Sequence, residues 1–332
     1  MLTALDFEKP VVELDKKITE LKNLSADGSL NLDSEVKKLE SRLLHLKKET
    51  YLHLTPWQRV QIARHPKRPY TLDYIQRIFT DFVECHGDRT FADDKALIGG
   101  FAKLDGQTFL VLGHQKGRDA KENIMRNFGS AHPEGYRKAI RLMRMAEKFG
   151  IPIAVFVDTP GAYPGIGAEE RGQAYTIAYN LREMARLQVP IIVFVIGEGG
   201  SGGALGIGIG DRVLVLENAY YSVISPEGCA AILWKDRTKA PEAAAALKLT
   251  AKDLLEMKLI DEMVREPLGG AHKDPDETAE RVKAAIKRFW KEQKEVHKNE
   301  LTDRRYEKFR RMGVFEVLHD KKPETKRISH PK

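Results

Sequence analysis

The stretch IIVFVIGEGGSGGA, residues 191–204, decides the fold of this 332-residue chain. Its first six residues are a continuous apolar run, which is typical of a strand buried on both faces of a parallel sheet. The glycines that follow leave the backbone almost without side chains, so another molecule can approach the main chain closely. Residues 204–207 predict the start of a short helix. The stretch therefore predicts a strand-to-helix junction that presents backbone N–H groups, rather than a reactive side chain, to a ligand.

A second strand ends in a similar way. Residues 153–157, IAVFV, are another continuous apolar run, and the loop DTPGAYPG follows at 158–165. Prolines restrict this loop, and its glycines allow close approach or a positive φ. Because ligands of α/β folds bind at the carboxyl ends of the strands, the amides of the two loops are expected to act together as an oxyanion site. An ordinary tight strand-to-helix loop is the alternative interpretation of residues 158–165.

The composition indicates a globular protein. Cys85 and Cys229 are far apart and form no C-x-x-C pair, so neither a structural zinc site nor a disulfide framework is expected, and a cytoplasmic location fits. Residues 1–10 lack the apolar core of a signal peptide. The stretch 191–210 has the length of a membrane span, but Glu198 and eight glycines argue against one. The formal net charge of +7 has no accompanying zinc-finger or RNP-type motif, so nucleic acid is not expected as the main partner.

Alternating strand and helix patterns fill much of the chain. Strands are expected at 96–104 and 108–113, joined by the hairpin signal Asp105-Gly106, and at 213–216 and 220–224. Thr55-Pro56 and Thr71-Leu72 predict helix starts. Further helices are expected at 133–149, at 168–187 and from about 276 to 301, with others beginning at residues 226, 241 and 251. The end of the chain, from residue 321, predicts a disordered tail.

Residues 1–50 predict a helical hairpin that forms an arm. Asp27-Gly28-Ser29 supplies the turn, and Ser34 is the expected N-cap of the second helix. Each helix has one apolar face, formed by Val11, Leu14, Ile18 and Leu21 in the first and by Val36, Leu39, Leu43 and Leu46 in the second. Packing of the arm on its own domain and packing between subunits both remain open.

One known binding motif and one known catalytic motif overlap the glycine run. Gly197-x-Gly199-x-x-Gly202 matches a dinucleotide fingerprint, with Glu217 near the position of the ribose-binding acid, but only ten residues separate Gly202 from the next expected strand. Gly199-x-Ser201-x-Gly203 matches a nucleophile elbow. A serine hydrolase with Ser201 as nucleophile is therefore the alternative function. It would require one of the later histidines, and none has a persuasive setting; these are His272, His297 and His319.

Several segments together carry a family resemblance. Besides the two loops, they are EERGQ at 169–173, YSVISPEG at 221–228 and GHQKG at 113–117. These motifs resemble the α subunit of the bacterial acetyl-CoA carboxylase carboxyltransferase, and the likeness spans roughly residues 1–300. The resemblance implies an α/β crotonase-like fold of repeated ββα units behind an N-terminal helical arm. We accordingly expect an arm at 1–50, a carboxyltransferase domain at 51–301 and a basic C-terminal extension at 302–332 with a disordered end.

The resemblance also implies an activity. The family transfers the carboxyl group of carboxybiotin, carried by the biotin carboxyl carrier protein, to acetyl-CoA and so forms malonyl-CoA. A homologous β subunit would complete the active site in an α₂β₂ assembly and carry the zinc, while this chain would bind no metal. Biotin carboxylase would belong to the larger complex. No membrane partner is expected.

The resemblance assigns roles to particular residues. The amides of Gly202 and Gly203, with Ala204, would stabilise the biotin-side oxyanion. Substrate would be bound by the bare backbone of Gly161, Ala162, Gly165, Gly199 and Gly200. Four basic residues would meet CoA phosphates or the acidic face of a partner, unless they form a solvated helix face: Lys116, Arg118, Lys121 and Arg126.

Overall fold

The computed structural model describes residues 4–26 and 32–313. Within these residues, eight strands form one sheet in the order β1-β2-β3-β4-β5-β6-β8, and β7 pairs with β5. The first three strands are antiparallel, and β3 to β4, β5, β6 and β8 pair in parallel. The strands are β1 (Thr80–Glu84), β2 (Leu97–Leu104), β3 (Gln107–His114), β4 (Ile153–Thr159), β5 (Ile191–Gly200), β6 (Arg212–Leu216), β7 (Tyr220–Ser222) and β8 (Glu262–Val264).

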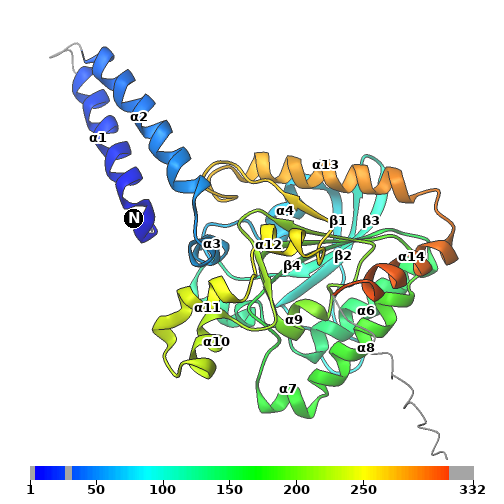
Figure 1. Cartoon of the computed structure of the whole chain (residues 1–332). Helices are drawn as coiled ribbons and strands as arrows, with labels where there is room; N and C mark the ends of the chain where they lie inside the picture. Colours follow the sequence, from blue (N-terminus) through cyan, green and yellow to red (C-terminus); the bar gives the residue numbers. More distant parts are fainter. Residues whose placement is uncertain (1–3, 27–31, 314–332) are drawn as a thin grey trace, which may run out of the picture.

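Helices cover both faces of the sheet (Figure 1). One face is covered by α4 (Thr71–Ile78) with α13 (Pro275–Gln293), and the other by α6 (Pro133–Lys148) and α8 (Gln173–Arg186), against which α14 (Lys298–Arg310) packs. The shorter helices are α3 (Pro56–Ala63), α5 (Ala120–Met125), α7 (Ile166–Glu170), α9 (Ser201–Leu205), α10 (Pro226–Leu233), α11 (Ala240–Ala246) and α12 (Ala251–Glu256). Single 3₁₀ turns are η1 (Asp6–Glu8), η2 (Asn127–Gly129) and η3 (Arg237–Lys239).

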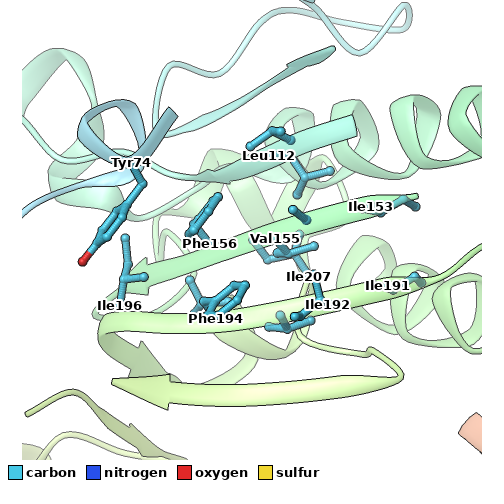
Figure 2. Close-up of a cluster of buried hydrophobic side chains, with 14 of the residues drawn as sticks. Tyr74, Leu112, Ile153, Val155, Phe156, Ile191, Ile192, Phe194, Ile196 and Ile207 are labelled. Carbon is cyan, nitrogen blue, oxygen red and sulfur yellow. The ribbon is translucent and has the colours of Figure 1, made fainter. Parts of the chain in front are cut away.

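The core lies around β4 and β5, whose residues are all buried. Tyr74, Phe156 and Phe194 stack in sequence across it, with ring centroids 5.5 Å and 5.7 Å apart (Figure 2). The continuous apolar runs at 153–157 and 191–196 therefore form the doubly covered strands that the sequence predicts. The remainder of the apolar stretch 191–210 contains α9. None of the helices within the described residues combines the length and the apolarity that crossing a membrane requires.

Local signals placed most elements to within a few residues. The hairpin at Asp105-Gly106 is confirmed, with φ of 49° and 82° at its two turn residues, which joins β2 to β3. Thr55 caps α3 as predicted, and its hydroxyl oxygen accepts a hydrogen bond from the Gln58 amide at 3.2 Å. The start predicted at Thr71 is confirmed, since Thr71 is the first residue of α4, whereas the N-cap predicted at Ser34 is wrong by two residues, because Leu32 precedes the second arm helix.

Two predicted helices are each divided. The segment 168–187 breaks at Gly172, whose φ of 83° is left-handed, into α7 and α8. The segment from 276 onward ends at Gln293 and resumes as α14, so the single long helix predicted there is wrong. The strand predicted at 220–224 is shorter, because Pro226 begins α10 and Ser225 is its N-cap.

The arm consists of α1 (Lys9–Ala26) and α2 (Asp33–Leu52), which project from the body as a helical pair (Figure 1). Their apolar faces pack against each other, so the hairpin buries its own seam instead of lying on its domain. At the base, Tyr51 donates a hydrogen bond to Glu8, and Lys273 Nζ lies 3.2 Å from Glu8 Oε1. The predicted turn Asp27-Gly28-Ser29 lies outside the described residues. The expected role of the arm in assembly stays a prediction.

The boundary predicted after residue 301 lies within α14, and the division into domains stays a prediction. Arg305 of this helix is fully buried and pairs with both carboxylate oxygens of Asp211, at 2.8 Å and 2.9 Å. Its guanidinium also donates to the carbonyl oxygens of Met184, Leu187 and Val189. This arginine ties α14 to the end of α8 and to the start of β6, and no local sequence pattern reveals such a contact. The tail predicted from residue 321 lies outside the described residues.

We expect Arg305→Met to destabilise the chain by about 3–5 kcal/mol, because it leaves the Asp211 carboxylate and three carbonyl groups without their buried donor. Urea unfolding of the purified chain measures this change. Arg304→Met is the matched control, since Arg304 is 58% exposed and, within the described part of the chain, forms its ion pair with Glu300 along the helix. Equal unfolding midpoints for the two variants would contradict the anchoring role of Arg305.

Candidate functional site

The site begins at a bulge in β5. Parallel pairing between β4 and β5 holds at Val157–Val195 and again at Thr159–Gly199, so Asp158 alone faces residues 196–198 of β5. The displaced backbone groups find side-chain partners. Arg68 Nε donates to the Ile196 carbonyl oxygen at 2.6 Å, and the Glu198 amide donates to Asp158 Oδ1 at 2.9 Å. A side chain at residue 197 would collide with the Asp158 carboxylate, 2.5 Å from its Cβ, which explains the glycine there.

Buried charges surround this bulge. Lys116 Nζ lies 2.7 Å from Asp158 Oδ1 and 2.8 Å from Glu198 Oε2. The other oxygen of Glu198 accepts hydrogen bonds at 2.7 Å from Arg64 Nε and from the Tyr220 hydroxyl. Burial by itself raises the pKa of Glu198, but the positive charges of Lys116 and Arg64 outweigh that effect and lower this pKa to about 2. The carboxylate is therefore ionised and fully engaged, which makes it a poor general base.

A second buried pair fixes Arg68. Its guanidinium makes two hydrogen bonds to Glu266, at 2.9 Å and 2.5 Å, and both side chains are fully buried. Glu266 also accepts hydrogen bonds from the amides of Asn218 and Ala271, at 3.0 Å and 2.7 Å. Arg68 is thereby held where it reaches the Ile196 carbonyl group.

Beyond the bulge, the glycine run touches the loop at 158–165. A Cβ atom on Gly200 would lie 2.2 Å from the Pro160 carbonyl oxygen, and one on Gly203 would lie 2.4 Å from the Ala162 nitrogen and 2.5 Å from the Gly161 carbonyl carbon. The two loops therefore meet backbone to backbone, as the sequence predicts. Thr159 fixes the turn within the loop at 158–165, since its hydroxyl donates to the Gly161 carbonyl oxygen at 2.8 Å.

The short helix α9 starts at this contact. The first amides of a helix have no acceptor within it, and here they belong to Ser201, Gly202 and Gly203. Ala204 is the fourth residue of α9. Of the three predicted residues, Gly202 and Gly203 therefore lie in the part of the helix whose amides lack an acceptor within it. At the other end of α9, the Tyr136 hydroxyl donates to the Gly203 carbonyl at 3.2 Å, which supports the helix after a single turn.

The glycines predicted for the site, whether as an oxyanion donor or for substrate binding, differ in what surrounds them. Gly161 has φ of 154° and open space where a Cβ would stand, and a Cβ on Gly202 would meet only the Ile177 side chain, at 3.6 Å. The backbone is therefore exposed at these two positions. By contrast, Gly165 makes room for the ring of Tyr163 and Gly199 for the ring of Tyr221. At Gly165 and Gly199 the missing side chain is explained by packing inside the protein.

Three of the four predicted phosphate contacts are engaged internally. Lys116 is held by the two carboxylates, which is a correction of its predicted role. Arg118 lies 3.9 Å above the Tyr70 ring and donates to the carbonyl groups of Pro66 and Arg68, while Arg126 pairs with Glu122 at 3.0 Å. Lys121 is exposed and contacts no charged partner among the described residues. The interpretation as a solvated helix face fits Lys121, which is exposed on α5.

No hydrolase triad forms around Ser201. Its φ of 49° is left-handed, as a sharp strand-to-helix turn requires, but no histidine within the described residues is hydrogen-bonded to it. His272 stacks on His65, with ring centroids 3.9 Å apart, and His297 caps α14, while His319 lies outside the described residues. Across residues 4–26 and 32–313, no group of three or more metal-ligating side chains is assembled either.

Solved structures identify the class of fold. The chain is similar to transcarboxylase 12S with methylmalonyl-coenzyme A and methylmalonic acid bound, with a TM-score of 0.54 and 20% identity, over 68% of this chain and 42% of that one. It is also similar to a Pseudomonas malonate decarboxylase hetero-tetramer in complex with coenzyme A, with a TM-score of 0.53 and 17% identity, over 66% and 86% of the two chains. The chain has the crotonase-like fold of the carboxyltransferases, as the resemblance implied.

Sequence relatives identify the family within that class. Residues 4–313 match the family described as acetyl co-enzyme A carboxylase carboxyltransferase-like. Relatives named acetyl-coenzyme A carboxylase carboxyl transferase subunit alpha include one from Thermus thermophilus, 57% identical over 94% of this chain and 98% of its own length. Another, from Geobacter metallireducens, is 60% identical over the same shares of the two chains. The chain belongs to this family of carboxyltransferase α subunits, and none of these relatives is a serine hydrolase.

The two loop glycines 202 and 203 should respond differently to a methyl group. Gly203→Ala places its Cβ against the backbone of Gly161 and Ala162, which cannot rotate away, so a loss of about 1–3 kcal/mol is expected. Gly202→Ala meets only the end of the Ile177 side chain and adds a better helix former, so its stability should equal or exceed that of the parent chain. Thermal unfolding of both variants tests the loop contact, and equal midpoints would contradict it.

Proposed function

We propose that this chain is the α half of a two-subunit carboxyltransferase that uses carboxybiotin on a biotin carboxyl carrier protein to convert acetyl-CoA to malonyl-CoA, the first committed step of fatty acid synthesis. The observation that carries the proposal is the near full-length identity of 57–60% to the two relatives named above. The geometry supports it, because the glycine run and the loop at 158–165 leave exposed backbone where they meet.

The residues of this chain would act mainly by position. When bound, carboxybiotin supplies the carboxyl group. The Gly202 and Gly203 amides are fixed donors, and they would stabilise negative charge that develops on an oxygen atom placed before them. Gly161 and Ala162 form the facing wall, since Gly203 lies against their backbone. Fixed donors need no reorganisation during the reaction, so no charged side chain of this chain has to act as acid or base.

The remaining assignments follow from the family. A homologous β subunit would supply the acetyl-CoA side of the active site and carry the zinc, in an α₂β₂ assembly. The carrier protein and biotin carboxylase would join this assembly in the cytoplasm. Within the chain, we assign residues 1–50 to the arm and place the end of the carboxyltransferase domain after α14 instead of at residue 301, because Arg305 anchors that helix.

This chain combined with its β subunit should form malonyl-CoA from acetyl-CoA and carboxybiotin, whereas neither subunit alone should do so. The reason is that the donors proposed in this chain, the Gly202 and Gly203 amides, form one site, while the reaction has two substrates whose oxygens must be stabilised. Radiolabelled carboxyl transfer measures the product. Full transfer by the single purified chain would contradict the divided site, and no transfer by the assembled pair would contradict the proposed function.

Ser201→Ala should keep the greater part of the activity of the assembled enzyme, because the hydroxyl has no base beside it and Ser201 serves as a small residue at a left-handed turn. A nucleophilic serine would instead lose roughly 10³-fold or more in kcat. Steady-state kinetics on the assembled variant decides between the two functions. A near-complete loss with fold and assembly intact would favour the hydrolase.

A further inference from the structure

One ammonium group links the ends of three neighbouring strands. Lys116 follows β3 by two residues, Asp158 lies near the end of β4 and Glu198 near the end of β5. The Lys116 side chain is only 11% exposed, and its ammonium group contacts both carboxylates within 2.8 Å. Burial disfavours the charged form of this lysine, but the two carboxylates more than compensate and raise its pKa. The two carboxylates therefore hold the Lys116 ammonium group in its charged form.

Stability is a weak explanation for such a bridge. Buried ion pairs contribute little net stability compared with apolar residues of the same volume, because each charge loses its hydration. A bridge of this kind does fix the positions of its partners. Here each partner adjoins one of the two loops, since Asp158 is the first residue of the loop at 158–165 and Glu198 directly precedes Gly199 and Gly200.

The bridge also contacts a third segment beside the two loops. A Cβ on Gly129 would lie 2.9 Å from Lys116 Cγ and 3.0 Å from the Asp158 carbonyl oxygen, so the backbone of η2 rests directly on the lysine. Asn127 and Phe128 in that turn both have left-handed φ, of 46° and 54°. Non-glycine residues adopt this conformation only when the surroundings impose it. The lysine stem is thus enclosed, and its ammonium group has little freedom to leave the carboxylates.

We propose that Lys116 is a positioning residue for carboxyl transfer, whose ammonium group ties Asp158 to Glu198 and so holds the two loops where the Gly202 and Gly203 amides face the substrate. The inference rests on the proposed function and deepens it. It replaces the earlier expectation that Lys116 meets CoA phosphates. It also explains why an α subunit would retain a buried lysine that touches no substrate.

The surroundings predict what happens without the lysine. Glu198 would still face Arg64 and Tyr220, and Arg64 pairs in turn with Glu227, while Asp158 would keep the Glu198 amide. His114 is buried and its pKa is lowered to about 3 by burial and by Lys116, so it supplies no replacement charge. Among the described residues, further ionisable groups around the bridge are Tyr70, Tyr74 and Arg68. Without Lys116, two carboxylates would face each other, and the pKa of Glu198 would rise from about 2.

A proton could then take the place of the lysine. Once protonated, Glu198 can donate an O–H hydrogen bond to Asp158 and bring the two strand ends together again. Because protonation grows as the pH falls, the activity of a variant without Lys116 should recover toward acidic pH. In the parent enzyme Glu198 remains ionised across this range, so the bridge makes no such contribution to its pH profile.

The test uses Lys116→Met in the assembled α–β enzyme. We expect kcat to fall about 10²-fold, because displacement of fixed groups by around 1 Å has that effect, while KM for acetyl-CoA changes less than about threefold. The ratio of variant to parent kcat should rise as the pH is lowered from about 8 to about 6. Hydrogen–deuterium exchange should be faster in segments 158–165 and 196–204, which provides a readout independent of activity.

Lys308→Met is the matched control. Lys308 is 16% exposed on its side chain and pairs with Asp261 Oδ2 at 2.5 Å, so it is a comparably buried lysine on α14, remote from the two loops. Its loss should reduce stability while leaving kcat and exchange in both segments unchanged. If Lys116→Met does not assemble, the double variant Lys116→Met/Glu198→Met removes one charge of each sign, leaves no side-chain donor at residue 198 that could reach Asp158, and should show the same loss of kcat.

The outcomes separate the two proposals. An assembled parent enzyme that forms no malonyl-CoA overturns the proposed function before any variant is considered. With an active parent, the positioning role is overturned by a folded Lys116→Met enzyme, or by the folded double variant, with kcat within about threefold of the parent. It is equally overturned by a loss confined to KM, by a pH-independent ratio, or by the same kcat loss in Lys308→Met.

Discussion

The pairing of β4 and β5 shifts register after Val157, so buried backbone groups there lose the hydrogen-bond partners that regular sheet pairing would provide. The rest of the site follows from the side chains that form hydrogen bonds with those groups instead. An unpaired buried amide or carbonyl costs about 1–3 kcal/mol, so substitutes are required. Arg68 serves the Ile196 carbonyl and Asp158 serves the Glu198 amide. These side chains carry charges that must in turn be paired, which brings in Glu266 and Lys116. A single irregularity between two strands thus accounts for a connected set of buried ions.

The same irregularity determines the direction in which the chain leaves the sheet. With three residues of β5 opposite one of β4, the glycine run reaches the backbone of the loop at 158–165. Gly200 and Gly203 can have no side chain there, because backbone atoms of the other loop occupy the space. The absence of a side chain at these two positions therefore has a steric reason. The amides of Gly202 and Gly203 are rigid as a consequence, and rigidity is what a fixed donor needs.

The buried charged side chains and the exposed glycine backbone have separate roles in the site. Glu198 and Lys116 are saturated by each other and by Arg64 and Asp158, so they are not available for proton transfer. This arrangement suits the proposed function, in which fixed backbone donors and a second subunit would act on the substrates. It does not suit a hydrolase, since Ser201 has no hydrogen-bonded histidine within the described residues.

Local patterns in the sequence predicted the buried strands and the meeting of the two loops, and the resemblance of the motifs to a known family implied the class of fold. Apolar runs at 153–157 and 191–196, the Asp105-Gly106 turn and the glycine motifs each act within a few residues, so they can be interpreted without the structure. The break at Gly172 and the anchoring of α14 by Arg305 were missed, because a glycine inside a helical pattern is ambiguous and a buried arginine resembles a surface one.

Tertiary structure alone decided the partners of Lys116, which lie 42 and 82 residues further along the chain, and the contribution of Arg64 and Arg68 from a segment before the sheet begins. The local sequence around a lysine does not distinguish a side chain that faces solvent from one that contacts two buried carboxylates. The register of β4 and β5 makes the difference, because the bulge brings Asp158 and Glu198 to one point, and register arises only when the strands pair.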